Sequence, residues 1–135
     1  MKLYRGVMLV LAVAFGGVGA IVLFVPEDVL AVFNALSPAF GLPPGPAEPT
    51  GFFVILSSAY MYTVMYIAAT VYLHPRHQIL PMVLVHAKAV SSIISLGFFL
   101  LSAPLLIYAT NFVVDGVIAL VVWLLKRRCT GRRAR

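Results

Sequence analysis

Two residues of opposite charge lie within long apolar stretches of the chain. Lys88 is the tenth residue of the stretch 79–101, and Asp115 is the eleventh residue of the stretch 105–125. An ionised side chain at the centre of a bilayer costs about 2.5–3.5 kcal/mol on insertion scales, so two opposite charges in neighbouring helices are expected to pair. If the chain turns at Ala103, the two Cα atoms differ in height by roughly 4–5 Å, which a lysine side chain can span. The sequence therefore predicts an ion pair between Lys88 and Asp115 inside the membrane.

Polar side chains accompany both charges at helical spacing. Three serines follow Lys88 at i+3, i+4 and i+7, while Asn111 and Tyr108 precede Asp115 at i−4 and i−7. Residues at these spacings share one face of a helix, and polar faces in lipid point toward other helices or a wet cavity. Two tyrosines of another apolar stretch, spaced four apart, are expected to add their hydroxyl groups. The candidate polar site comprises Lys88, Ser91, Ser92, Ser95, Tyr108, Asn111 and Asp115, with Tyr62 and Tyr66.

Two functions fit this site, and the sequence leaves both open. The favoured one is a structural, accessory or assembly role, in which the ion pair fixes the register and orientation of the helices. The alternative is a small channel or proton-coupled transporter that moves an ion or a small polar solute past Lys88 and Asp115. The sequence contains no HExxH, nucleophile-elbow or glycine-rich phosphate motif, so neither an enzyme nor a cofactor is expected.

Such a site requires helices that cross a membrane. The 135 residues are 62% hydrophobic and 10% charged, whereas soluble domains carry about 25% charged residues. Pro104 separates the last two of four apolar stretches and predicts a helical hairpin there. The expected fold is an all-α integral membrane protein, a single domain over 1–135 built as a four-transmembrane-helix bundle. Its predicted spans are 7–25, 51–73, 79–101 and 105–125.

The positive charges predict how the chain is oriented in the membrane. Nine of the ten Lys and Arg residues lie at the two termini or in the connection 72–78, and the outer loop 26–50 has none. The positive-inside rule therefore places both termini in the cytoplasm, in a plasma or inner membrane. Cleavage of the first span as a signal peptide is an alternative that would leave three spans. However, its apolar run extends to Val25, beyond the usual 7–15 residues.

The outer loop carries the pattern of a short helix. A proline and two acids at 26–28 are typical of a helix start, and apolar residues recur at helical spacing from Val29 to Leu36. An amphipathic helix within 26–39, lying on the extracytoplasmic surface, is the prediction, and an irregular apolar loop is the alternative. The proline-rich segment 41–49 is expected to be extended.

Small residues and basic residues predict two kinds of contact. Ala12, Gly16 and Ala20 form a ridge at spacing four, which favours close packing within the chain over a homodimer seam. The basic cytoplasmic tail 126–135 holds six cations and is expected to bind anionic lipid headgroups rather than nucleic acid. A homo-oligomer or a larger membrane complex is a further expected partner. The predicted headgroup contacts are Lys126, Arg127, Arg128, Arg132 and Arg133.

The histidines are weaker candidates for a functional site than the charged pair. His86 points about 200° away from the Lys88 stripe, and a neutral imidazole bonded to a neighbouring helix is favoured over a proton relay. His74 and His77 have only Cys129 as a conceivable third ligand, so no metal site is expected.

Overall fold

The computed structural model describes residues 2–46 and 51–131, and these ranges contain helices and no strand. Four of the helices are long and apolar enough to cross a membrane, as the sequence predicts. In chain order the elements are α1 (Lys2–Phe24), α2 (Pro26–Leu36), the 3-10 helix η1 (Ser37–Phe40), α3 (Gly51–Leu73), α4 (Ile79–Leu101) and α5 (Leu106–Gly131).

The helix ends differ from the predicted spans at the two basic termini. Helices α3 and α4 have the predicted bounds, but α1 begins at Lys2, and α5 continues past Leu125 to Gly131. Lys and Arg are good helix formers, so a helix need not end where its apolar stretch ends. Hydropathy predicts which part of a helix can lie in hydrocarbon, whereas the helix propensity of the basic residues allows the helix to continue past that part.

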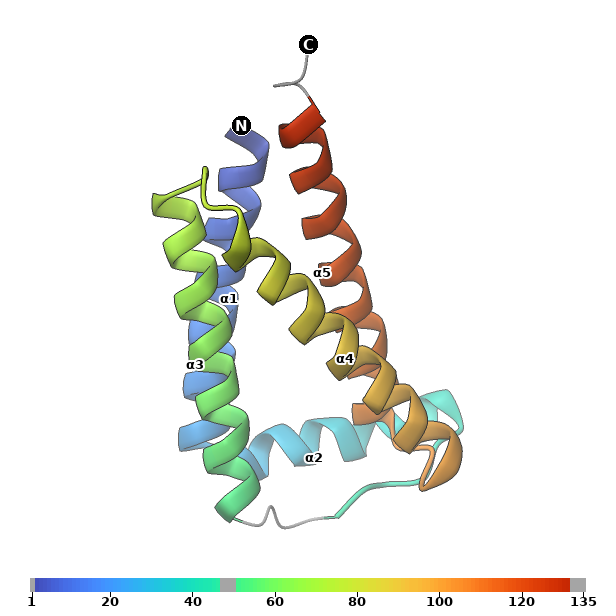
Figure 1. Cartoon of the computed structure of the whole chain (residues 1–135). Coiled ribbons are helices and arrows are strands. Elements are labelled where there is room, and N and C mark those ends of the chain that lie inside the picture. The colour runs from blue at the N-terminus through green and yellow to red at the C-terminus, as the bar shows by residue number, and fades with distance from the viewer. Residues whose placement is uncertain (1, 47–50, 132–135) are drawn as a thin grey trace.

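The four long helices pack as two pairs. Helix α1 lies along α3 and α4 lies along α5, with far less contact between the pairs (Figure 1). Both termini and the α3–α4 connection lie at one end of the molecule, while α2 crosses the opposite end. At the end that holds the termini, Lys126 Nζ of α5 donates a hydrogen bond to the carbonyl of Gln78 in the connection. The predicted α4–α5 hairpin is therefore one of the two pairs, and α1 and α3 form the other.

Glycines allow α1 and α3 to approach closely. A Cβ atom added at Gly19 would lie 2.9 Å from Met61 Cβ, and one at Gly16 would lie 3.0 Å from Met65 Sδ. Ala12 is buried on the same face, but Ala20 is exposed, so its predicted place in the ridge is wrong. A spacing of four residues advances 400° round the helix and drifts off the face, whereas Gly19, at i+7 from Ala12, returns to it.

Helix α2 forms within the predicted range, with Pro26 in its first turn and Glu27 and Asp28 beside it. The side chain of Asn34 in α2 makes two hydrogen bonds to the backbone of the proline-rich segment. Asn34 Nδ2 donates to the Gly45 carbonyl at 3.2 Å, and the Gly45 amide donates to Asn34 Oδ1 at 2.7 Å. The chain enters this segment through Gly41, whose φ of 66° suits glycine. Residues 47–50 lie outside the described part of the chain.

Candidate functional site

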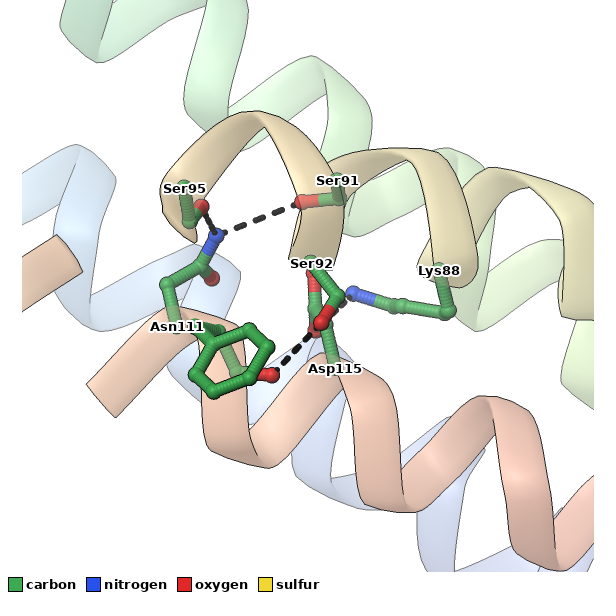
Figure 2. Close-up of polar contacts among 7 residues, drawn as sticks. Lys88, Ser91, Ser92, Ser95, Asn111 and Asp115 are labelled. Atoms are coloured by element: carbon green, nitrogen blue, oxygen red, sulfur yellow. Dashed lines mark hydrogen bonds and ion pairs between the residues drawn. The ribbon is translucent and has the colours of Figure 1, made fainter. Parts of the chain in front are cut away.

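The predicted ion pair is present at the contact between α4 and α5. Lys88 Nζ lies 2.8 Å from Asp115 Oδ1, and the two side chains are 1% and 3% exposed (Figure 2). Both groups are thus buried inside the protein. Because each charge has the other as its partner, neither is buried alone.

The ammonium group of Lys88 also meets the other two long helices. It lies 4.0 Å from the ring centroid of Phe15 on α1 and 4.8 Å from that of Tyr60 on α3. An aromatic face attracts a cation at this range, most strongly where water is excluded. Lys88 of α4 therefore contacts α1, α3 and α5 through one nitrogen atom. We call Lys88, Asp115, Phe15 and Tyr60 the lysine hub.

The predicted polar stripes face each other beside the hub. Asn111 Nδ2 donates to Ser95 Oγ at 2.6 Å and to Ser91 Oγ at 3.3 Å (Figure 2). Ser92 Oγ donates to the carbonyl of Phe112 at 2.7 Å. A Cβ atom at Gly116 would lie 3.1 Å from Ser92 Oγ, so this glycine keeps α5 close to the serine. The stripes thus serve as hydrogen-bonded contacts between α4 and α5.

Three predicted tyrosines stand apart from this network. Tyr62 and Tyr66 are each 61% exposed, so the prediction that they complete the polar site is wrong. Tyr108 is partly buried, and its ring packs against Phe98 with the centroids 5.7 Å apart. The inward face of α3 carries Tyr60, which sequence reasoning missed. Tyr60 shares a helical face with the buried Val64 and Val71, but the sequence alone does not indicate that this face turns inward.

Two oxygens of the hub are buried without a hydrogen-bond partner among the described residues, one on Asp115 and the hydroxyl of Tyr60. Asp115 Oδ2 has none among the described residues, although Oδ1 of the same carboxylate binds Lys88. A carboxylate oxygen accepts hydrogen bonds. The site can therefore hold its helices together and can also accept a bond from one further donor.

The basic residues at the end that holds the termini make several intramolecular contacts. The Arg127 guanidinium lies 4.5 Å from the Trp123 ring centroid, and that of Arg5 lies 4.9 Å from Tyr72. Arg128 is exposed, while Lys126 is partly buried. Arg132 and Arg133 lie outside the described residues. This end offers exposed cations beside aromatic rings, an arrangement typical of a membrane–water boundary.

No family model matches the chain, and no curated protein or solved structure matches it either. What the site can do follows from its own residues.

His86 is exposed, and its Nδ1 lies 2.7 Å from the Met82 carbonyl of the same helix. The predicted bond from His86 to a neighbouring helix is therefore wrong. Among the described residues no cluster could hold a metal ion.

Proposed function

We propose that this chain is a small integral membrane protein with a structural or accessory role, in which the lysine hub joins two helix pairs into one unit. The observation that carries the proposal is that Lys88 Nζ contacts one residue from each of the other three long helices. The helix pairs otherwise share little contact. An ion pair is expensive in lipid, so its position at this junction favours a role in holding the helices.

In the proposed orientation, both termini of the protein lie in the cytoplasm. Its support is that the termini and the α3–α4 connection share one end of the molecule, and that the outer loop carries no cation. At the other end, α2 has no buried residue and exposes Val32 and Leu36. Exposed apolar side chains on a short helix suit the interface between headgroups and hydrocarbon. We accordingly place α2 on the extracytoplasmic surface of a plasma or inner membrane.

The basic tail is proposed to contact anionic headgroups through Arg127 and Arg128. Each cation near such a surface contributes about 1 kcal/mol of attraction. Lys126 is expected to contribute less to headgroup binding, because its ammonium group already binds the Gln78 carbonyl.

A channel or proton-coupled transporter is the second candidate function. The observation that favours it is the buried Asp115 Oδ2 without a partner among the described residues. A carboxylate oxygen in this state could take up a proton or bind a small donor in transit. The ammonium group of Lys88 would then place a positive charge beside this pathway.

The two functions separate in sealed vesicles. The purified protein is reconstituted into vesicles that contain a pH-sensitive dye. If its role is structural, these vesicles should hold proton and potassium gradients for as long as protein-free vesicles do. The double variant Lys88→Met/Asp115→Leu serves as the matched protein, because an apolar pair leaves no buried charge without a partner. A proton or potassium flux that appears with the wild type and disappears with the double variant would support the transporter and contradict the structural proposal.

A further inference from the structure

Two buried oxygen atoms of the lysine hub are complementary in their hydrogen bonding. Asp115 Oδ2 and the Tyr60 hydroxyl are both buried and have no hydrogen-bond partner among the described residues. A carboxylate oxygen accepts hydrogen bonds, whereas a phenol hydroxyl can donate one. Either group is costly to bury unpaired, because it has lost its hydration and gained no bond in return. The hub therefore holds one unmet acceptor and one unmet donor.

Both oxygens belong to side chains that surround a single nitrogen atom. Lys88 Nζ lies 2.8 Å from Asp115 Oδ1 and 4.8 Å from the centroid of the Tyr60 ring. The Tyr60 phenol also interacts electrostatically with Asp115 and approaches the hydroxyl group of Ser91 on α4. Asp115 is 2% exposed, so its free oxygen faces the interior of the protein. The two unmet groups thus come from α3 and α5, one from each helix pair.

The charges round these oxygens decide which kind of molecule fits between them. Lys88 and Asp115 are paired, so the hub is neutral as a whole. A cation at Asp115 Oδ2 would be repelled by the ammonium group on the same carboxylate, and an anion would be repelled by the carboxylate itself. A neutral molecule that both donates and accepts meets neither repulsion. Water has this chemistry, and buried water molecules typically bind about three otherwise unsatisfied polar groups.

We propose, on the basis of the structural function proposed above, that one buried water molecule bridges Asp115 Oδ2 and the Tyr60 hydroxyl. The water donates a hydrogen bond to Asp115 Oδ2 and accepts one from Tyr60. A bridge of this kind is nearly as favourable in enthalpy as a direct hydrogen bond. It gives the two helix pairs a second polar link beside Lys88, and it occupies the carboxylate oxygen that a transported proton or ion would need.

Loss of the Tyr60 hydroxyl tests whether that group has a partner. Tyr60→Phe keeps a ring beside Lys88 and should raise the equilibrium constant for unfolding about three- to tenfold, as expected for one lost hydrogen bond. Removal of a hydroxyl buried without any partner would instead be neutral or stabilising. Tyr62→Phe is the matched control, because Tyr62 lies exposed on the same helix. Equal unfolding of the two variants, or a more stable Tyr60→Phe, would overturn the proposal.

The same assay shows whether the hydroxyl group acts through the carboxylate. In the Lys88→Met/Asp115→Leu background the acceptor is gone, so Tyr60→Phe should no longer raise the unfolding constant. An undiminished effect there would contradict the bridge. Tyr60→Phe leaves the ion pair itself in place, so a negative result removes the water and not the structural function, which the single variants of Lys88 and Asp115 test separately.

A crystal structure of the wild type at a resolution that shows ordered water distinguishes a bridge from a direct bond. We expect one density peak within about 2.5–3.0 Å of both Asp115 Oδ2 and Tyr60 Oη, and no such peak in Tyr60→Phe. A direct hydrogen bond between the two oxygens, a bound ion in place of water, or no peak in the wild type would overturn the proposal.

Discussion

At the scale of single residues, the arrangement round Lys88 explains how a charge is kept in an apolar interior. Asp115 supplies the opposite charge, and Phe15 and Tyr60 supply ring faces where water is excluded. The pair could be predicted from sequence, because two isolated charges at similar depth in a hairpin have few other partners. Phe15 and Tyr60 could not, because an aromatic side chain in a span fits lipid as well as a core.

The amide of Asn111 should contribute measurably to the α4–α5 contact. Asn111→Leu removes two hydrogen bonds to serines, and we expect it to lower the free energy of unfolding by about 1–2 kcal/mol. Unfolding by a denaturing detergent, followed by circular dichroism, gives the value. Tyr108→Phe is the control, and its stability should match the wild type. Equal losses in both variants would show that the amide is not the cause.

At the scale of helices, a sequence predicts spans better than it predicts which spans pack together. The bounds of α3 and α4 agree with the apolar stretches, since both are determined locally. The pairing of α1 with α3 depends on which glycines meet which methionines, and a rule of small residues at spacing four selects Ala20 in place of Gly19. The tyrosines of α3 were misplaced for the same reason, because a stripe of hydroxyl groups does not say which face turns inward.

The α1–α3 contact should be sensitive to one methyl group. In Gly19→Ala, the new Cβ would lie 2.9 Å from Met61 Cβ, so the helices must separate. In Gly17→Ala, the added atom meets open space. Both changes gain the same helix propensity, so the difference between the two variants isolates the contact. We expect Gly19→Ala to be less stable than Gly17→Ala by about 1–3 kcal/mol. Equal stabilities in the same unfolding assay would contradict the packing.

The Asn34 side chain should control the proline-rich segment. Asn34→Ala removes both hydrogen bonds to Gly45, so the Gly45 amide should exchange its hydrogen faster by an order of magnitude or more. Ser37→Ala, which removes a bond only to the Phe33 carbonyl, serves as the control. Unchanged exchange at Gly45 in Asn34→Ala would show that the segment is held by other contacts.

At the scale of the whole molecule, the two ends differ in charge and in structure. Cations and both termini lie at one end, and α2 with the proline-rich segment lies at the other. In a Cys129→Ser background, single cysteines in Gln78→Cys and Ser102→Cys should therefore react with an impermeant thiol reagent from opposite sides of sealed cells. Ser102→Cys should react from outside and Gln78→Cys only after lysis. Reaction of both from one side would contradict four crossings.

The most direct test of the account is a double-mutant cycle on the lysine hub. Lys88→Met and Asp115→Leu alone should each lower the free energy of unfolding by about 3–5 kcal/mol, because each leaves a buried charge without its partner. The double variant should recover most of that loss, since an apolar pair leaves no charge behind. Losses that simply add in the double variant would contradict the claim that this ion pair joins the helices.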